Sequence, residues 1–456
     1  MKYQAYNLHN YKKIKQVEKL SRREIFDAEV VGRILPFKTN NYVVNELIDW
    51  DNYQDDPFYI LNFPQREMVS KKGYDKMADA LNTGLSRTEI NEIANNIRLS
   101  LNPHPSGQLE HNVPTLNGEK LNGIQHKYRE TVLFFPAQGQ TCHAYCTFCF
   151  RWPQFSGMMD YKFAMKEAGK LVEYLKKHPR VTDVLFTGGD PMIMKASFLE
   201  AYIDALLEAD LPHLKTIRIG TKTLSFWPYR YLTDNDADDI LRVFEKVSKA
   251  GKHLAFMAHF SHYRELSTKA VKKATKRIQE TGAQIRSQSP ILDHINADQE
   301  VWARMWQEQV NMNIIPYYMF IARETGAQKF FAVPLYKTLR IFRQAYSKMS
   351  GIGRTVRGPV MSANPGKVHI VGTTEVKGKK MFVLNFIQGR KNEWVGKPYF
   401  AKFDDQALWL NDLKPAFGFE EFFFKDEMNR MFANPENSMK QGRIDPELDI
   451  QYPFYS

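Results

Sequence analysis

The sequence is poor in cysteine and cannot form a disulfide framework. Its 456 residues contain only three cysteines, and all three lie between positions 142 and 149. An odd number of closely packed thiols excludes a network of structural disulfides, whereas a reducing cytosol keeps such thiols available as metal ligands. The cysteine content therefore favours a cytoplasmic metalloprotein over a secreted, disulfide-bonded one.

Long apolar runs, targeting segments and nucleic-acid signatures are also missing. No stretch reaches the length of a membrane span, and the first twenty residues lack the apolar core and small-residue cleavage site of a secretory signal. No arginine-rich tract, RNA-binding motif or internal repeat occurs. The formal charge of +12 is a modest average over this length, and it favours a solvated basic surface over a nucleic-acid face. We expect no membrane partner and no nucleic-acid partner.

The chain does have enough apolar side chains for one large catalytic domain with two appendages, since 43% of its residues are hydrophobic. The first ~105 residues show amphipathic helical spacing, and the sequence SRTE at 86–89 fits a helix capping box. Residues 102–107 (NPHPSG) then break the pattern. We predict a helical N-terminal region over 1–107, a catalytic domain over 108–375 and a C-terminal extension over 376–456.

Short apolar runs alternate with helical stretches from about residue 130, as is typical of β-α units around a parallel sheet. The six runs begin at Glu130, Val181, Leu214, His253, Gln284 and Asn313. Helical spacing occupies intervals such as 197–210 and 297–312. Six units predict an α/β fold built as a partial (βα)6 barrel, with its chemistry at the C-terminal ends of the strands. Further apolar runs at 367–372 and 380–386 predict an added hairpin.

Cys142, Cys146 and Cys149 form a C-x3-C-x2-C arrangement directly after the first predicted strand. Thiolates are the usual ligands of iron-sulfur clusters, and three thiolates on a 4Fe-4S cluster leave one iron open to a substrate or cofactor. A structural zinc site would need a fourth ligand. His143 is nearby, but the sequence offers no second cysteine pair. Structural zinc and chance clustering of buried cysteines remain the alternatives.

This loop resembles the signature of radical S-adenosylmethionine enzymes. The resemblance implies that the open iron chelates the methionine part of S-adenosylmethionine, whose reductive cleavage yields a 5'-deoxyadenosyl radical. Gly188, Gly189 and Asp190, in the sequence TGGDP at the end of the second predicted strand, resemble the family's glycine motif, which contacts that methionine. Paired glycines let a backbone approach a ligand closely, although such glycines also mark simple tight turns.

A longer stretch, from His126 to Lys367, resembles the lysine 2,3-aminomutase family within these radical enzymes. Its pieces occur in family order: HKY at 126, CHAYCTFCFR at 142, TGGDP at 187, RIGTKT at 218, HFSH at 259, QSPIL at 288, PYY at 316 and NPGK at 364. The resemblance implies an isomerase that moves the amino group of a small amino acid from Cα to Cβ. It implies a 4Fe-4S cluster, S-adenosylmethionine and pyridoxal 5'-phosphate (PLP) as cofactors. An electron donor such as flavodoxin or ferredoxin is expected as a partner, and a homo-oligomeric state is left open.

The same resemblance implies roles for individual residues. Lys367 matches the lysine that binds PLP covalently, and Tyr128 matches the aromatic residue stacked on the pyridoxal ring. Arg151 matches the arginine that clamps the substrate carboxylate, a task that suits a guanidinium. His259 and Gln288 match positions that contact S-adenosylmethionine. Without this context, each would be read as an ordinary surface lysine, loop arginine or strand-end polar group.

The chain departs from the family pattern near the expected phosphate of PLP. The glycine run before Lys367 is shorter than in relatives, and Thr131 stands where relatives usually carry a second phosphate-binding arginine. Lys127 and Arg129 are the basic residues nearest to this place in the sequence. Basic side chains suit a phosphate, so we expect these two to neutralise it.

Arg323 bears on the choice of substrate. Lysine-specific members hold the distal ammonium of their substrate with two acids, and here Arg323 and either Ser362 or Asn364 stand at those places. An arginine repels a lysine side chain and attracts a carboxylate, and relatives that act on glutamate resemble this chain there. An outward-turned Arg323, or one paired with Glu324, is the alternative.

We therefore predict a radical 2,3-aminomutase for an acidic amino acid such as glutamate. The alternatives are a lysine 2,3-aminomutase, a radical enzyme without PLP, and a nucleic-acid-modifying protein.

Replacing Cys142, Cys146 and Cys149 together by alanine should abolish the cluster, because three thiolates hold it. Anaerobic reconstitution followed by iron counting measures this. Stoichiometric zinc without iron-sulfur absorbance in the wild type would contradict the prediction, as would full cleavage of S-adenosylmethionine by the triple variant.

Overall fold

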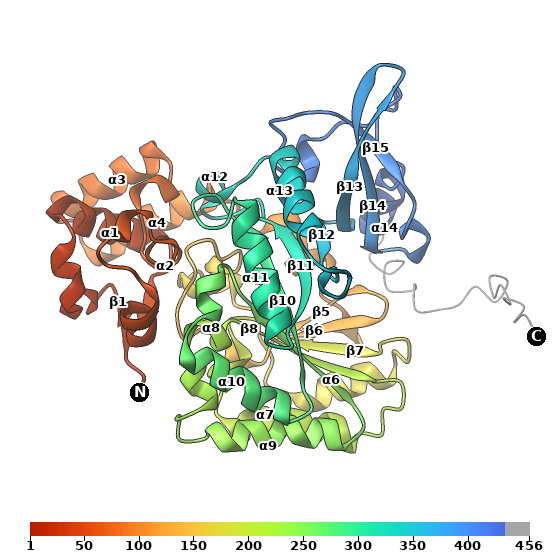
Figure 1. Cartoon of the computed structure of the whole chain (residues 1–456), viewed down its shortest axis with the longest axis horizontal. Helices are drawn as coiled ribbons and strands as arrows, with labels where there is room; N and C mark the ends of the chain where they lie inside the picture. Colours follow the sequence, from red (N-terminus) through yellow and green to blue (C-terminus); the bar gives the residue numbers. More distant parts are fainter. Residues whose placement is uncertain (434–456) are drawn as a thin grey trace, which may run out of the picture.

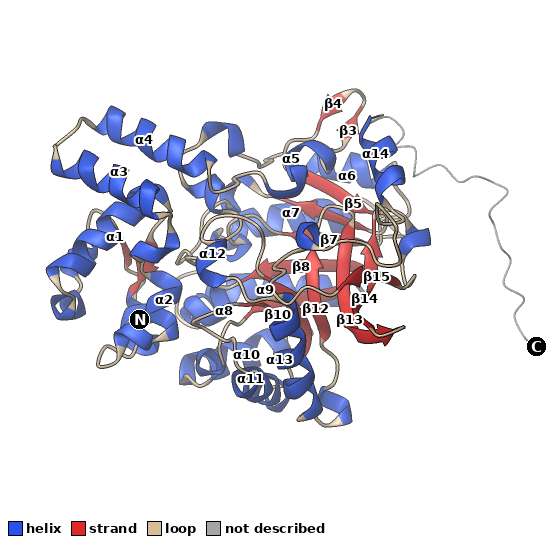
Figure 2. Ribbon diagram, turned by 90° about the horizontal axis from the view of Figure 1, so that it is seen from above, coloured by secondary structure: helices blue, strands red, loops and turns tan. Residues whose placement is uncertain are grey.

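The computed structural model describes residues 1–433 and combines helices with one large sheet (Figures 1 and 2). The eleven strands of the sheet lie in the order β15-β14-β13-β12-β11-β10-β9-β8-β7-β6-β5. Neighbours from β6 to β12 are parallel, whereas β5 and the strands from β13 to β15 pair antiparallel. The fold is therefore mixed α/β with a large, mostly parallel sheet. Within the described residues no helix is both long and apolar enough to cross a bilayer.

The strands from one edge to the other are β5 (Ile124–Tyr128), β6 (Thr131–Phe134), β7 (Asp183–Phe186), β8 (Thr216–Thr221), β9 (His253–His259), β10 (Gln284–Ile291), β11 (Ile315–Ile321), β12 (Arg357–Ser362), β13 (Gly366–Val376), β14 (Lys379–Gly389) and β15 (Tyr399–Lys402). The longer helices that follow the parallel strands are α6 (Ala168–Lys176), α7 (Ala196–Glu208), α9 (Ala237–Lys249), α10 (Lys269–Glu280), α11 (Gln299–Asn311) and α13 (Leu335–Ser347). All six strands predicted from the sequence are present, and α7 and α11 occupy the two predicted helical intervals. This part of the prediction is confirmed.

Alternate residues of the parallel strands face opposite ways, which separates the core from the site. On β8, Ile217 and Ile219 are buried in the main apolar core together with Phe244 from α9. The residues between them face the other side of the sheet, because side chains alternate along a strand. On that side Arg218 forms an ion pair with Asp183 of β7 at 2.7 Å. Charged groups can therefore gather on one face of a sheet whose other face is apolar.

The N-terminal region consists mainly of α1 (Arg22–Ile34), α2 (Pro57–Asn62), α3 (Lys71–Asn82) and α4 (Arg87–Leu99), with a short ribbon of β1 (Ala5–Asn7) and β2 (Lys38–Asn40). The predicted capping box is confirmed, since Ser86 and Glu89 bond to each other's backbone N–H at the start of α4. In Figures 1 and 2 these helices lie at the end of the molecule opposite β13 to β15. Their apolar core includes Ala144 and Trp152. The N-terminal region thus packs directly against the cysteine-containing segment.

The predicted hairpin is confirmed as β13 and β14, joined at Lys377 and Gly378, which both have positive φ. Such conformations match the twist of a two-residue hairpin turn. The hairpin continues the sheet beyond β12, since Ser362 pairs with Lys367 and Lys367 pairs with Gln388. Position 375 lies inside β13, so the hairpin spans the boundary expected from the sequence. Of the predicted C-terminal extension, residues 434–456 lie outside the described part of the chain.

Candidate active site

A cavity of about 120 Å³ lies between β5, the end of β11, the end of β12 and the segment that follows Cys149. Its lining residues include three cations, Lys127, Arg151 and Arg323, and no aspartate or glutamate. Tyr128, Ser362 and Asn364 also line it. Several residues that the sequence predicted for PLP and for the substrate therefore meet at one place.

The guanidinium of Arg151 is held by aromatic rings. Its Cζ atom lies 4.6 Å from the ring centroid of Phe135 and 4.9 Å from that of Phe150. Among the described residues it makes no hydrogen bond or ion pair. Burial lowers the pKa of Arg151 to about 10. An arginine fixed in this way, without a counter-ion, is suited to bind a carboxylate in bidentate fashion.

Arg323 follows β11 and faces the cavity while staying close to Glu324. One Nη atom donates to Oγ of Ser106 at 3.0 Å, and Nε lies 3.9 Å from a carboxylate oxygen of Glu324. Nε itself has no hydrogen-bond partner. Burial lowers the pKa of Arg323, and Glu324 opposes this. The ion pair expected as an alternative is therefore present, yet Arg323 keeps a free donor.

Lys127 and Tyr128 of β5 form the wall next to Lys367. Lys127 donates through Nζ to the carbonyl oxygen of Ala363. Burial and the nearby cations, Arg390 above all, hold the pKa of Lys127 well below its usual value. The Tyr128 ring has Nζ of Lys127 at 5.3 Å and Nζ of Lys367 at 5.1 Å from its centroid, and the buried Tyr128 hydroxyl has no hydrogen-bond partner.

Arg129 does not reach this wall. Its side chain is 44% exposed and forms an ion pair with Glu130 at 2.7 Å, and it is absent from the cavity lining. Of the two basic residues expected near a phosphate, the structure places only Lys127 at the cavity.

Lys367 lies on β13 between two aromatic rings. Its Nζ donates to the side-chain oxygen of Gln388 and lies 5.0 Å from the ring centroid of Tyr318. Burial, together with Arg218, lowers the pKa of Lys367 to about 7. A neutral amine is the form that attacks an aldehyde, so the lowered pKa of Lys367 favours its reactive form at neutral pH.

The turn before Lys367 is braced from β14. A Cβ atom on Gly366 would lie 2.3 Å from the backbone oxygen of Gln388, so glycine permits the close approach of the two strands. Arg390, just beyond β14, donates to the backbone and side-chain oxygens of Asn364 at 2.9 Å each and to the side-chain oxygen of Asn112 at 2.6 Å. These contacts fix the segment that carries Lys367.

These residues fit PLP. Lys367 has a reactive amine, Tyr128 presents an aromatic face beside it, and the surplus of buried cations around Lys127 matches a phosphate. The basis of this fit is the chemistry of these side chains, namely the Lys367 amine and the positive charges of the described residues that no carboxylate offsets.

The three cysteines lie in the loop formed by residues 140–151, here called the cysteine loop. None of the three cysteines is in a disulfide and each residue as a whole is half-buried, while burial of the thiols raises the pKa of all three. No three His, Cys, Asp or Glu side chains of residues 1–433 converge on the position of a single metal ion. A 4Fe-4S cluster binds each thiolate through a different iron, so it does not require such convergence.

His143 does not act as a fourth ligand in this geometry. It is 5% exposed, its Nδ1 lies 3.0 Å from Oγ1 of Thr223, and its ring stacks on Trp227 with centroids 6.4 Å apart. The ring is thus engaged on the side of α8 (Thr223–Phe226). The geometry disfavours the zinc alternative.

Gly188, Gly189 and Asp190 follow β7 and contact the start of the cysteine loop. A Cβ atom on Gly189 would lie 2.5 Å from the backbone N and O of Thr141. Gly188 has a φ of 133°, a value that favours glycine. The Asp190 carboxylate accepts hydrogen bonds from the hydroxyl of Thr221 and from neighbouring groups at the ends of β7 and β8. The motif therefore joins two strand ends to the cysteine loop, and its contact with S-adenosylmethionine stays a prediction.

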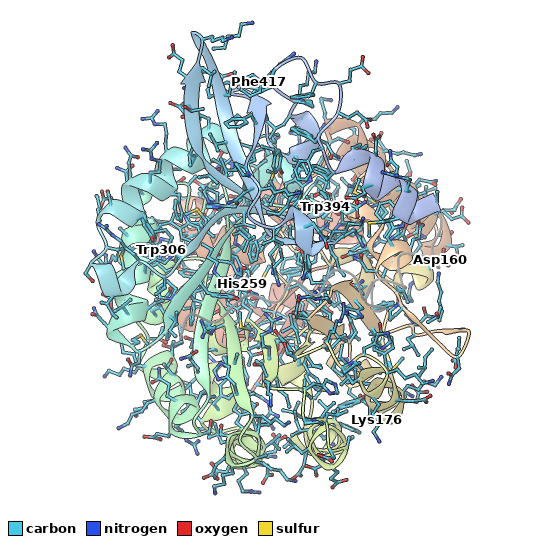
Figure 3. All side chains as sticks on the ribbon, turned by 90° about the vertical axis from the view of Figure 1, so that its right-hand side faces the viewer. Asp160, Lys176, His259, Trp306, Trp394 and Phe417 are labelled. Carbon is cyan, nitrogen blue, oxygen red and sulfur yellow. The ribbon has the colours of Figure 1, made fainter. Side chains whose placement is uncertain are left out.

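His259, the last residue of β9, pairs with Gln288, which lies inside β10. His259 is labelled near the middle of the view in Figure 3, and its ring centroid is 5.6 Å from that of Phe148 in the cysteine loop. Burial holds the pKa of His259 well below its usual value. The two predicted S-adenosylmethionine contacts therefore lie side by side and close to the cysteines.

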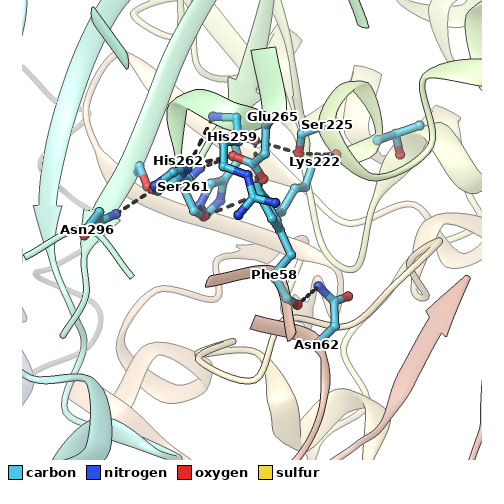
Figure 4. Close-up of polar contacts among 12 residues, drawn as sticks. Phe58, Asn62, Lys222, Ser225, His259, Ser261, His262, Glu265 and Asn296 are labelled. Atoms are coloured by element: carbon cyan, nitrogen blue, oxygen red, sulfur yellow. Dashed lines mark hydrogen bonds and ion pairs between the residues drawn. The ribbon is translucent and has the colours of Figure 1, made fainter. Parts of the chain in front are cut away.

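Sequence reasoning missed a buried ion pair beside His259 (Figure 4). Lys222 lies 2.7 Å from a carboxylate oxygen of Glu265, and Glu265 also accepts from the backbone N–H groups of Ser261 and His262. Lys222 lies within the matched RIGTKT segment but has no local pattern that indicates a role. Arg390 and Gln388 were missed because the apolar runs in this part of the sequence predict only two strands and give no role to single polar residues.

Covalent attachment of PLP to Lys367 should require deprotonation with a midpoint near pH 7. The pKa of about 7 means that the amine is protonated and unreactive below this pH, whereas an ordinary lysine needs a pH near ~10.4. The initial rate of adduct formation in PLP-free protein, trapped with borohydride at a series of pH values, measures this. Lys367→Met is the control and should give no adduct at this site. An adduct on another lysine, or a midpoint near that of an exposed lysine, would contradict the assignment.

Gly189→Ala should destabilise the site, because its Cβ would meet the backbone of Thr141. Overpacking of this kind costs about 1–3 kcal/mol of unfolding free energy, and the variant should retain less iron. Thermal unfolding and iron content measure both effects. Gly169→Ala is the matched control, because Gly169 lies in α6 with open space around it, and it should be neutral or stabilising by up to about 1 kcal/mol. Equal behaviour of the two variants would argue against the close contact.

The chain is similar in sequence to known aminomutases. No protein-family model matches the chain. A protein of Aquifex aeolicus, provisionally named L-lysine 2,3-aminomutase, is 31% identical over 88% of this chain and 93% of its own length. A glutamate 2,3-aminomutase of Clostridioides difficile is 28% identical over 46% of this chain and 47% of its own length. A crystal structure of Streptococcus suis SuiB bound to the precursor peptide SuiA aligns with a TM-score of 0.34 and 15% identity, over 60% of this chain and 56% of that one. The chain belongs to the lysine 2,3-aminomutase family, a group of isomerases that move an amino group with the help of a 4Fe-4S cluster, S-adenosylmethionine and PLP.

Proposed function

We propose that this amino acid 2,3-aminomutase acts on an acidic amino acid such as glutamate. The observation that carries the proposal is the cavity wall, which has three cations and no acid. The ammonium of a lysine substrate would find no carboxylate there and would meet like charges instead. A second carboxylate on the substrate would find a guanidinium.

The cations divide into three tasks. Arg151, which has no counter-ion, binds the α-carboxylate of the substrate. Arg323 binds the side-chain carboxylate through its unpaired Nε, and the neutral Ser362 and Asn364 stand where a lysine-specific site needs an acid. Lys127 neutralises the phosphate of PLP. Each pairing is charge-assisted, which makes it stronger than a neutral hydrogen bond.

When bound, S-adenosylmethionine at the cluster supplies the radical that removes a substrate hydrogen, and PLP carries the migrating amino group. The chain's own residues hold and orient these groups. Lys367 attaches PLP and Tyr128 lies against its ring. The residues proposed to hold the cluster and S-adenosylmethionine are Cys142, Cys146, Cys149, Gly188, Gly189, Asp190, His259 and Gln288.

The proposal includes the architecture around the site. We take β6 to β11 with their helices as a partial (βα)6 barrel, because the cysteine loop, Gly188 and His259 all follow C-terminal strand ends, where barrel chemistry collects. Residues 1–107, 108–375 and 376–456 are its proposed divisions. An electron donor such as flavodoxin or ferredoxin and a cytoplasmic location complete the proposal, since reductive cleavage needs an electron and the thiols need a reducing compartment.

Lysine is the second candidate substrate. Glu324 approaches Arg323 to 3.9 Å, and a rearrangement that freed this carboxylate would supply the counter-charge that a lysine ammonium needs. The Aquifex aeolicus relative is also named for lysine. Glu324 is absent from the cavity lining, which favours the acidic substrate.

Arg323→Asp should reverse the preference of the enzyme. Loss of a charge-assisted hydrogen bond costs about 1.5–3 kcal/mol, so kcat/KM for glutamate should fall by about 10- to 100-fold relative to lysine. Competition assays with glutamate, aspartate and lysine measure the ratio directly.

Arg242→Asp is the matched control, because it makes the same charge change at an exposed position of α9, and it should leave the ratio unchanged. Equal or better turnover of lysine by the wild type would defeat the proposal, whatever the variant does.

A further inference from the structure

The cysteine loop obtains many of its backbone hydrogen bonds from the N-terminal region. The carbonyl oxygen of His143 accepts from Oη of Tyr3 at 2.7 Å and from Nδ2 of Asn40 at 3.2 Å. The N–H of Thr147 donates to the carbonyl oxygen of Leu61 at 2.9 Å. Polar groups of an irregular buried loop need such partners. Segments about 100 residues earlier in the chain therefore fix the path of the loop.

Lys38 contacts this loop at two points. Its Nζ donates to the carbonyl oxygen of Cys142 at 2.7 Å, and its own carbonyl oxygen accepts from the N–H of Tyr145 at 2.7 Å. Lys38 begins β2, which pairs with β1. One residue on a paired strand thus holds the segment that runs from the first cysteine towards Cys146.

The ammonium of Lys38 also has no counter-ion of its own. No carboxylate of the described residues lies within ion-pair distance of it, and its other close partner is the ring of Tyr145, with Nζ 5.7 Å from the centroid. The positive charge is therefore directed at the cysteine loop. A cluster held by thiolates becomes more negative when it is reduced, so a nearby unpaired cation stabilises the reduced form.

We propose that Lys38 is a positioning residue of the iron-sulfur site, which holds the cysteine loop in place and raises the reduction potential of the cluster. This inference rests on the proposed assignment of the cluster to the three cysteines. It makes the N-terminal region a functional part of the site.

The test compares the reconstituted full-length protein with Lys38→Met, Lys38→Arg and Lys15→Met. Methionine keeps the length of the side chain but removes the charge and the donor, arginine restores both, and Lys15 is an exposed lysine of the same region. Iron and sulfide content and the midpoint potential of the cluster, from a redox titration followed by electron paramagnetic resonance, are measured without S-adenosylmethionine or substrate. Lys38→Met should have a lower midpoint potential than the wild type, whereas Lys38→Arg and Lys15→Met should match the wild type.

A loss of iron from Lys38→Met that Lys38→Arg restores, at unchanged melting temperature, also supports the positioning role. A wild-type potential and iron content in Lys38→Met would overturn the inference, as would an effect that Lys38→Arg fails to reverse. The cysteine assignment fails separately, if the triple alanine variant keeps its cluster. If the triple alanine variant loses its cluster while Lys38→Met keeps a cluster of wild-type potential, the role of Lys38 is refuted and the cysteine assignment stands.

Discussion

Buried positive charge in excess of the neighbouring carboxylates is the constraint on which the cavity depends. Lys127, Arg151 and Arg323 line it, Arg390 bonds to its lining residues Asn112 and Asn364, and each of the four cations has a pKa lowered by burial. Removing a cation from water costs several kcal/mol unless a partner compensates. The protein offsets part of this cost with neutral groups, namely the carbonyl oxygens that accept from Lys127 and Arg390 and the aromatic rings that flank Arg151. Anionic ligands supply the remainder, so binding of PLP and of the substrate carboxylate also stabilises the folded chain.

Sequence patterns predicted the fold well where the signal is periodic and local. The six parallel strands were found because apolar runs alternate with amphipathic helices, and α4 was found by its capping box. The family motifs likewise predicted that Tyr128, Arg151, Arg323 and Lys367 belong to one site. The structure places all four around one cavity, or immediately beside it.

Single polar residues that act across long separations could not be predicted. Lys38 and Cys142 are 104 positions apart, and Arg390 and Asn112 are 278 positions apart. Hydrophobic periodicity does not indicate such a contact, because the contact depends on how whole helices and strands pack against one another. Arg129 shows the converse. Proximity in sequence to Tyr128 suggested a phosphate contact, but Arg129 lies in the turn between β5 and β6, where its side chain pairs with the neighbouring Glu130.

The reactivity of Lys367 depends on its hydrogen-bond acceptor being a neutral amide and not a carboxylate. A carboxylate next to Nζ would pair with the ammonium and raise the pKa of Lys367, which would undo the effect of burial. The hydrogen-bond acceptor on β14 is instead the amide of Gln388, which satisfies one donor without adding negative charge. Asp183 raises the pKa of Lys367 but forms an ion pair with Arg218 at 2.7 Å, and Arg218 itself lowers the pKa of Lys367. A neutral acceptor and a neutralised acid together leave the pKa of Lys367 lowered to about 7, so the uncharged amine that attachment to an aldehyde requires is available near neutral pH.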